Sequence, residues 1–336
     1  MSEPIFKNIT EPPKAGRHEL YHWCDYIELR CLSHTDHRFS RDALSEAIDE
    51  QIANTTDSLS DDEFDDDEND DTTTEEALSK PDLNEQHAAN CFKHLRWRAK
   101  AFSTDWPFEI DEHALEIKLK STLNDMQRFY LSLLISSSLR YCPKKRWRAL
   151  TGLFERASLE IFKKLMPDGA SVHAFGAAES TRYTGHLFDR LTKLTQDVRG
   201  QLDLEKHNFS KRDTGDAGLD LVAWHDLCDE RKGIPIAFAQ CGCTENGWPD
   251  KMLQASPAHL AGHLNTMHEW ATYYFMPLDL SIEHEGRMDW HKRSDFSRAI
   301  VIDRLRFIRL ASLYSLSAPD ITATSEIHEA ASLKTT

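Results

Sequence analysis

Apolar positions in the first 145 residues recur with the period of an α-helix. They return every three or four residues in LYHWCDYIEL and DALSEAIDEQI, which predicts that residues 17–54 are mostly helical. Residues 87–102 predict another helix, which ends before Pro107 because proline disfavours the helical conformation in the residue preceding it. A strongly apolar, buried helix is expected at 123–142. We therefore expect an α-rich N-terminal module over residues 1–145.

From residue 146 onward, short apolar runs alternate with helical patterns. Residues 146–166 have an amphipathic helical pattern, and the apolar runs at 219–225 and 234–242 are the main strand candidates. This alternation predicts a mixed α/β domain over 146–317, followed by a flexible tail over 318–336. The other predicted elements are a short β-like run at 171–177, helices at 185–198 and 248–254, a strand at 271–280 and a final helix at 298–316.

An acidic segment separates the first helices from the rest of the chain. Residues 57–76 contain 12 Asp or Glu and no Lys or Arg. Segment 55–82 therefore predicts a disordered insert, or alternatively an acidic mimic of DNA that occupies a basic site. Without those 12 acids the chain has 44 acidic and 40 basic residues, so its net charge of −16 does not exclude a phosphate-bearing partner.

Cysteine usage and hydropathy indicate in which cellular compartment the protein is located. The seven cysteines are scattered and odd in number, which favours reduced thiols over a disulfide framework. No run of eighteen or more apolar residues occurs, and MSEPIFKNITEPPK lacks the apolar region of a secretory signal. We expect a cytoplasmic protein without a membrane span.

Two polar positions stand out in the strand candidates. In GDAGLD, the glycines permit a tight turn that places Asp220 at the start of an apolar strand. A carboxylate buried there needs a cation, and a divalent metal is one choice; the other is an Asx turn in which Asp216 or Asp220 binds backbone N–H groups. Gln240 interrupts the next apolar strand, either as a ligand beside Asp220 or as a buried amide bonded to backbone.

This arrangement resembles the PD-(D/E)xK phosphodiesterase superfamily, and within it the Mrr-like restriction endonucleases and related prokaryotic defence nucleases. Gly152-Leu153-Phe154-Glu155 matches the family's glutamate on the helix before the strands. The resemblance covers about residues 150–255, extending toward 316. It implies a restriction-endonuclease-like core, a mixed central sheet flanked by helices. It also implies that Asp220 and Glu155 hold Mg²⁺ (or Mn²⁺), with Gln240 and the carbonyl of Cys241 completing the site.

One position departs from the family pattern. A lysine is expected two residues after Gln240, where this chain has Gly242. Lys251, in the first turn of the helix that Pro249 begins, is the candidate to replace it and to stabilise charge on phosphorus. The alternative is that Lys251 is an ordinary surface lysine and the site does not catalyse.

The function implied by the resemblance is metal-dependent endonucleolytic hydrolysis of DNA in a prokaryotic antiviral defence or restriction system. No GxxxxGK[ST] motif occurs, which suggests that an ATPase or sensor protein acts as a partner. The alternatives are a non-catalytic nucleic-acid-binding or assembly subunit on the same fold, and a ribonuclease.

Other sequence patterns are candidates for metal sites or for phosphate binding. Cys228, Cys241 and Cys243 lack the paired C-x₂-C spacing of zinc sites, and His259 and His263 lack a glutamate between them. Two basic groups are candidates for DNA phosphates or are solvated helix ends. They are Arg140, Lys144, Lys145, Arg146 and Arg148 in the first group, and Arg96, Arg98 and Lys100 around Trp97 in the second. Asp303, Arg304 and Arg306 are expected to form local salt bridges.

Overall fold

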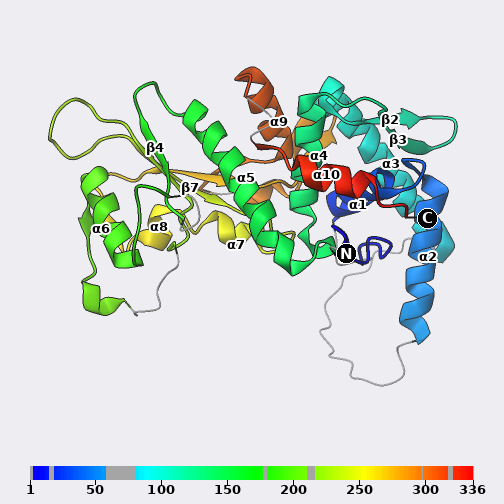
Figure 1. Ribbon diagram of the computed structural model, residues 1–336, viewed down its shortest axis with the longest axis horizontal. Helices are drawn as coiled ribbons and strands as arrows, with labels where there is room; N and C mark the ends of the chain where they lie inside the picture. The colour runs from blue at the N-terminus through cyan, green and yellow to red at the C-terminus, as the bar shows by residue number, and fades with distance from the viewer. Residues whose placement is uncertain are drawn as a thin grey trace.

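The computed structural model describes residues 3–14, 19–57, 80–176, 180–209, 216–296, 298–316 and 321–335. The N-terminal helices gather at one end of the molecule, and the central sheet extends from them toward α6 and α8 at the other end (Figure 1). Helices α2 (Arg41–Asp57) and α3 (Lys80–Phe102) reach into both ends of the predicted acidic insert. The insert's middle, residues 58–79, lies outside the described residues.

The N-terminal part is rich in helices, as predicted, but it also contains a small antiparallel sheet that the sequence pattern missed. The sheet has the order β1-β3-β2, and its strands are three or four residues long. Helix α4 has a capping box, in which the Asn124 side chain accepts from the Gln127 amide and Gln127 reciprocates. The bounds are α1 Leu20–Ser33, β1 Arg38–Ser40, β2 Phe108–Asp111, β3 Glu116–Leu119 and α4 Asp125–Ser137.

The second part is built on a five-stranded mixed sheet, which confirms the α/β class. Its strand order is β12-β9-β7-β6-β4. Strands β4, β6 and β7 pair antiparallel, whereas β7, β9 and β12 pair parallel. The strands are β4 Ser171–Ala174, β6 Leu221–Trp224, β7 Ile236–Cys241, β9 Ala271–Phe275 and β12 Ile300–Ile302.

Helices pack on both faces of this sheet because side chains alternate along β7. Ala237 and Ala239 lie in the same core as Phe154 of helix α5, whereas Phe238 lies in the core that contains Leu191 of helix α6. Helix α7 also packs away from α5, since its Met252 shares a third apolar cluster with the β9 side chain of Tyr274. The bounds are α5 Lys144–Leu165, α6 Leu187–Asp197, α7 Trp248–Met252 and α8 Pro257–Leu260.

The helix predicted at 298–316 is wrong at its start. Ile300–Ile302 form β12, which pairs with β9, and helix α9 (Arg304–Leu313) begins only after Asp303. The Asp303 carboxylate accepts from the Arg306 amide and thereby caps α9. A short apolar run next to a helix does not distinguish strand from helix by its period alone.

The chain end also differs from the predicted flexible tail. Helix α10 (Thr324–Ala331) packs against α4 and α1, and Ile327 and Ala330 are buried in the main core. Two small antiparallel pairs complete the described fold, and only the first of them is a hairpin. They are β10 (Ser281–His284) with β11 (Arg287–Trp290), and β5 (Gln201–Leu202) with β8 (Leu264–Asn265).

A buried ion cluster joins the N-terminal helices to the sheet domain. It consists of Asp25 and Glu28 on α1, Arg98 on α3, Asp279 after β9 and Arg304 on α9, all of them buried. Arg98 contacts Asp25 at 2.8 Å and Asp279 at 2.9 Å, and Arg304 contacts Asp25 at 2.6 Å. Arg98 is therefore not available to DNA phosphates, and Arg304 forms a long-range ion pair instead of the expected local one.

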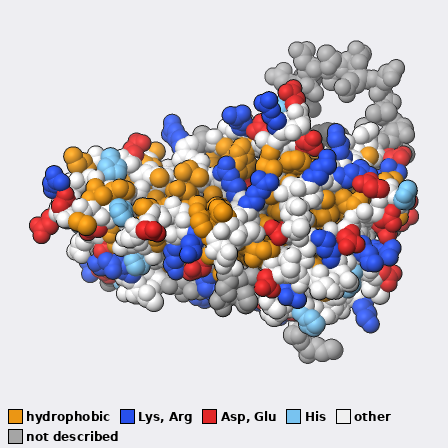
Figure 2. Space-filling view, turned by 90° about the horizontal axis from the view of Figure 1, so that it is seen from above, with side chains coloured by type: hydrophobic (Ala, Val, Ile, Leu, Met, Phe, Trp, Pro, Cys, Tyr) orange, Lys and Arg blue, Asp and Glu red, His pale blue; other side chains and the backbone are white. Residues whose placement is uncertain are grey.

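The surface carries no single-sign field on the face seen from above. Figure 2 shows basic, acidic and apolar side chains interspersed there. On this face, any recognition of a polyanion must therefore come from a local arrangement of cations.

Within the described ranges, no helix combines the length and apolar composition that crossing a membrane requires.

Candidate active site

The turn before β6 is tight, as its glycine content predicts. The Asp216 side chain accepts a hydrogen bond from the Gly218 amide at 2.9 Å, so Asp216 forms the Asx turn. Gly218 has φ +79°, and a Cβ there would lie 2.6 Å from the Cβ of Gln254. Only glycine fits this approach between the turn and the end of α7. Gly215 lies outside the described residues.

Asp220 follows this turn but does not bind its own loop. Its Oδ2 accepts the backbone N–H of Cys241 at 2.7 Å, and its own N–H donates to Ala239 at 3.0 Å. The side chain is 7% exposed. Burial raises the pKa of the Asp220 carboxyl well above its ordinary value, Glu155 adds to the rise, and the Cys241 amide and Lys251 oppose it. Asp220 is thus a buried carboxyl at the end of the β6–β7 pairing.

Glu155 reaches the same end of the sheet from helix α5. Its carboxylate is close enough to raise the pKa of Asp220, and it also contributes to the raised pKa values of the Cys241 and Cys243 thiols, which burial dominates. Ser158, one helical turn later, opposes the rise in the pKa of the Cys241 thiol, and its hydroxyl donates to the Phe154 carbonyl at 2.8 Å. The charge of Glu155 therefore acts on the Asp220 carboxyl, although the two residues lie in distant parts of the chain.

Gln240 lies opposite Asp220 in the strand register, one position beyond the Leu221–Ala239 pair. The side chain is 8% exposed, and its Oε1 has no hydrogen-bond donor among the described residues. Its Nε2 donates to the Cys241 carbonyl at 3.4 Å. A buried acceptor without a donor costs about 1–3 kcal/mol, which a bound water or ligand would offset.

Lys251 lies in helix α7, which begins after Gly247 in the left-handed conformation with Pro249 in its first turn. The side chain is half-buried, and its charge acts against the raised pKa of both Asp220 and Cys243. Within the described part of the chain, Lys251 forms no ion pair at 4 Å or less. Its charge therefore acts on Asp220 from beyond ion-pair distance.

Tyr274 explains why position 242 has no side chain. A Cβ on Gly242 would lie 2.1 Å from the Tyr274 hydroxyl and 2.9 Å from its ring. The tyrosine is fully buried on β9, so it has little room to move. A lysine at the family position is thus sterically excluded, a constraint that no local sequence signal showed.

Replacing Gly242 with alanine is expected to lower the free energy of unfolding by about 2 kcal/mol, because overpacking a well-filled core costs about 1–3 kcal/mol. Adding Tyr274→Phe to Gly242→Ala removes the nearest clashing atom and is expected to restore part of the loss. Urea unfolding of the two variants and of Tyr274→Phe alone measures this. Equal stability of Gly242→Ala and wild type would contradict the assigned packing.

The protein supplies some, but not all, of the ligands that a hard divalent cation needs. Among the described residues, no three His, Cys, Asp or Glu side chains come close enough to hold a metal by themselves. Two carboxyl groups, the Cys241 carbonyl and the donor-less Gln240 oxygen supply oxygen atoms. Mg²⁺ commonly binds one or two carboxylates and completes its shell with water and substrate phosphate, so this oxygen set suits it.

The rival metal patterns gain no support. Cys228 is exposed in the turn after β6, whereas Cys243 is buried beyond β7. His263 lies beyond the end of α8, so it does not share a helical face with His259. Comparisons of the chain with models of known protein families, with curated proteins and with solved structures find no match. Functional inference therefore depends on the chemistry of this site.

Proposed function

We propose that the protein is a metal-dependent endonuclease that hydrolyses phosphodiester bonds, with DNA as its substrate. The observation that carries this proposal is the buried Asp220 carboxyl at the end of the β6–β7 pairing, whose pKa is affected by the charges of Glu155 and Lys251, next to Gln240 with its donor-less side-chain oxygen. A mixed sheet with helices on both faces suits the restriction-endonuclease-like core that the resemblance implies. The chemistry is that expected of a PD-(D/E)xK enzyme.

In this proposal Asp220, Glu155 and the carbonyl of Cys241 bind Mg²⁺ or Mn²⁺. The cation, when bound, polarises a phosphoryl oxygen and lowers the pKa of a bound water. The Cys241 N–H fixes the orientation of the Asp220 carboxylate through its 2.7 Å hydrogen bond. Gln240 accepts a hydrogen bond from the attacking water, and Lys251 stabilises the negative charge that develops on the phosphoryl group.

A second reading has one specific observation in its favour. Because Tyr274 excludes a lysine at position 242, the site lacks the cation at the family's usual place. A non-catalytic nucleic-acid-binding or assembly subunit would retain the carboxyl groups and lose the chemistry. A role in prokaryotic antiviral defence or restriction, and an ATPase or sensor partner, follow only from the resemblance and belong to the proposal.

Cleavage of end-labelled DNA and RNA in Mg²⁺, Mn²⁺ or EDTA tests the function. We expect DNA cleavage with either metal and none in EDTA. Lys251→Ala is expected to lower the rate roughly 10²- to 10³-fold, since it removes a charge that acts on the transition state. Lys232→Ala, in the exposed β6–β7 turn at the opposite end of these strands, is the matched control and should cleave normally.

The same assay separates the alternatives. Cleavage restricted to RNA would show that the protein is a ribonuclease and that DNA is not its substrate. Retained binding with no cleavage in either metal would support the non-catalytic subunit. Full activity of Lys251→Ala would remove this lysine from the mechanism.

A further inference from the structure

Two cysteines from different helices meet in the N-terminal part. Cys24 lies on α1 and Cys91 on α3, 67 residues apart along the chain, and both thiols are free and fully buried. The Cys24 thiol donates to the Cys91 backbone carbonyl at 3.6 Å. Each cysteine also affects the pKa of the other, so the two thiols are neighbours in the same core. Neither thiol belongs to the proposed nuclease site.

His87 places an imidazole next to this pair. It lies one turn before Cys91 on α3, and its Nε2 is 3.8 Å from the Cys91 sulfur. The ring packs edge-on against Trp23, with the two ring centroids 4.7 Å apart. An imidazole beside a thiol is the arrangement that generates a reactive thiolate in many cysteine sites. His87 is therefore positioned to take the proton of Cys91.

The two thiols differ in how readily they ionise. The pKa of Cys91 is lowered, most of all by the Cys24 thiol. Burial opposes this shift, and His87 and Arg98 add to it. Burial raises the pKa of Cys24 well above its ordinary value, and Cys91 raises it further. Since the thiolate is the reactive form of cysteine, Cys91 is the nucleophile and Cys24 the protonated partner.

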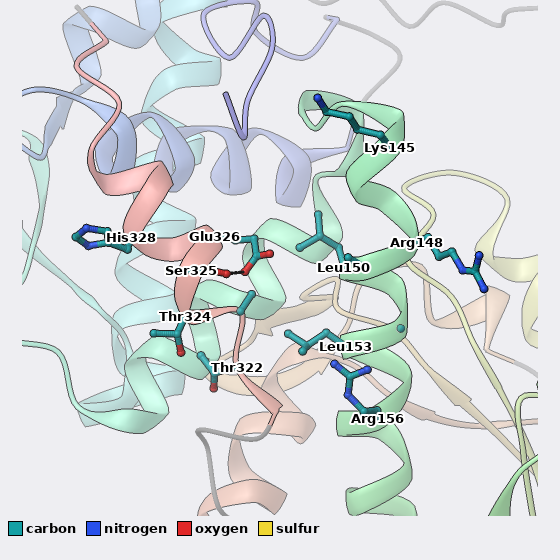
Figure 3. A pocket seen from close by; sticks show the side chains of 13 residues that line it. Lys145, Arg148, Leu150, Leu153, Arg156, Thr322, Thr324, Ser325, Glu326 and His328 are labelled. Carbon is teal, nitrogen blue, oxygen red and sulfur yellow. Dashed lines mark hydrogen bonds between the residues drawn. The ribbon is translucent and has the colours of Figure 1, made fainter. Parts of the chain in front are cut away.

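The pair lies where α1 and α3 pack together. Asp25 follows Cys24 on α1, and it contacts Arg98, two turns after Cys91 on α3, at 2.8 Å. Helix α1 also packs against α10, which Figure 3 shows across a groove from α5. These contacts fix α1 relative to its neighbours and keep the two thiols adjacent in the folded protein.

We propose that Cys24 and Cys91 are an oxidation-sensitive modification site, which hydrogen peroxide converts into a reversible disulfide between α1 and α3 with His87 as the base. In reducing compartments such disulfides are transient and serve in catalysis or redox sensing. The cross-link would join the same two helices that the Asp25–Arg98 ion pair holds.

The oxidation proceeds in two steps. His87 takes the Cys91 proton, and the thiolate attacks one oxygen of the peroxide. The O–O bond breaks, the leaving hydroxide recovers the proton from His87 as water, and Cys91 becomes a sulfenic acid. The Cys24 thiol then attacks the Cys91 sulfur, the S–O bond breaks, and a second water leaves with the Cys24 proton. Two thiols are oxidised and one peroxide is reduced, and a small dithiol reverses the reaction.

Burial selects the size of the oxidant. Cys24, Cys91 and Trp23 are buried, whereas His87 is half-buried and reaches toward the surface. Hydrogen peroxide is close to water in size, so it can reach the thiols past His87. Glutathione is far larger, and we expect its disulfide form to give no mixed disulfide with either cysteine in the folded protein.

Mass spectrometry of the full chain tests the proposal directly. Cys228 is exposed, so every protein carries Cys228→Ala to prevent disulfides between molecules. After peroxide treatment the protein is unfolded in N-ethylmaleimide and digested. We expect a Cys24–Cys91 cross-link that dithiothreitol removes. The oxidised protein should melt about 5 °C or more above the reduced one, because the cross-link closes a long loop of the unfolded chain.

Substitutions separate the roles of the residues. In Cys24→Ala the sulfenic acid at Cys91 should persist and be trapped by dimedone added with denaturant, whereas Cys91→Ala should give no such adduct at Cys24. His87→Gln should slow cross-linking roughly fivefold or more. Circular dichroism verifies folding of each variant. The matched controls are Cys142→Ala, at another buried thiol, and His284→Gln, at an exposed histidine, and both should cross-link at the normal rate.

The measurement on the protein with both cysteines needs no core substitution, so its outcome does not depend on how the variants fold. Full alkylation of Cys24 and Cys91 after peroxide treatment would overturn the proposal. A cross-link that forms only once the protein is unfolded would overturn it as well. An unchanged rate in His87→Gln would contradict the assignment of His87 as the base.

Discussion

Asp220→Asn is expected to lower phosphodiester hydrolysis roughly 10³-fold while the protein remains folded. Asparagine keeps an oxygen that accepts the Cys241 N–H, so the 2.7 Å hydrogen bond is preserved. It removes the negative charge on which cation binding depends, and a loss of about 4 kcal/mol in transition-state stabilisation corresponds to this factor. Rates of DNA cleavage in saturating Mg²⁺ or Mn²⁺ measure the effect.

The same substitution is expected to change how stability depends on pH. Since the pKa of Asp220 is raised in the folded state, its contribution to stability is present below the ordinary aspartate pKa of about 3.9. That contribution is lost as pH rises through the raised pKa. In EDTA, the difference in free energy of unfolding between Asp220→Asn and wild type should therefore grow in favour of the variant as pH rises.

Asp216→Asn is the matched control, because it removes a neighbouring charge and keeps the oxygen that accepts the Gly218 amide. Its cleavage rate should stay within a few-fold of wild type. Cleavage by Asp220→Asn at the wild-type rate would show that Asp220 is not part of the catalytic machinery. If the Asp220→Asn protein were unfolded, the hydrogen bond from the Cys241 N–H to residue 220 would not be sufficient to maintain the local structure.

Asp25→Ala is expected to have the largest effect on stability, a loss of about 3–5 kcal/mol, because it leaves buried cations without their acid. Asp25 contacts Arg98 and Arg304 at 2.8 Å and 2.6 Å, and both arginines are fully buried. Guanidinium unfolding measures the change. Glu112→Ala breaks the exposed Arg96–Glu112 pair and, as the control, should cost less than about 1 kcal/mol.

Acid should weaken this cluster in wild type. Burial raises the pKa of Asp25, but Arg304 and Arg98 outweigh it and lower that pKa to about 2. The contribution of a carboxylate with a lowered pKa is present above its unfolded value and is lost as pH falls from about 4 toward 2. Asp25→Ala should lack this part of the acid transition. A stability loss below 1 kcal/mol would show that the cluster does not hold the two parts together.

Much of the secondary structure could be predicted because its pattern is local. The helical period places α3, α4, α5 and α6 near their observed positions, and the apolar runs place β6, β7 and β9. What the pattern missed depends on partners far along the chain. β1 to β3 are too short to show a period, and β12 is a strand because β9 lies beside it. Helix α10 is ordered by contacts with α4 and α1.

In the candidate site, too, some features have a local sequence signal and others depend on contacts with distant parts of the chain. The GDAGLD turn, the buried Gln240 and the helix carrying Glu155 have local signals. The structure puts Asp220 and Gln240 at one end of the β6–β7 pair, and the charges of Glu155 and Lys251 affect the pKa of Asp220. Two facts had no local signal: Tyr274 fills the space at position 242, and Arg98 pairs with acids of α1 instead of lying free beside Trp97. Both are set by tertiary contacts.

Calorimetric titration with Mn²⁺ at pH 8 tests most directly the claim that Asp220 and Glu155 bind a divalent cation together. The wild type and the Asp216→Asn control are expected to show saturable binding at one site. Asp220→Asn and Glu155→Gln are each expected to weaken it at least tenfold. Unchanged Mn²⁺ affinity in both variants, or no saturable binding by the wild type with or without DNA present, would contradict the account.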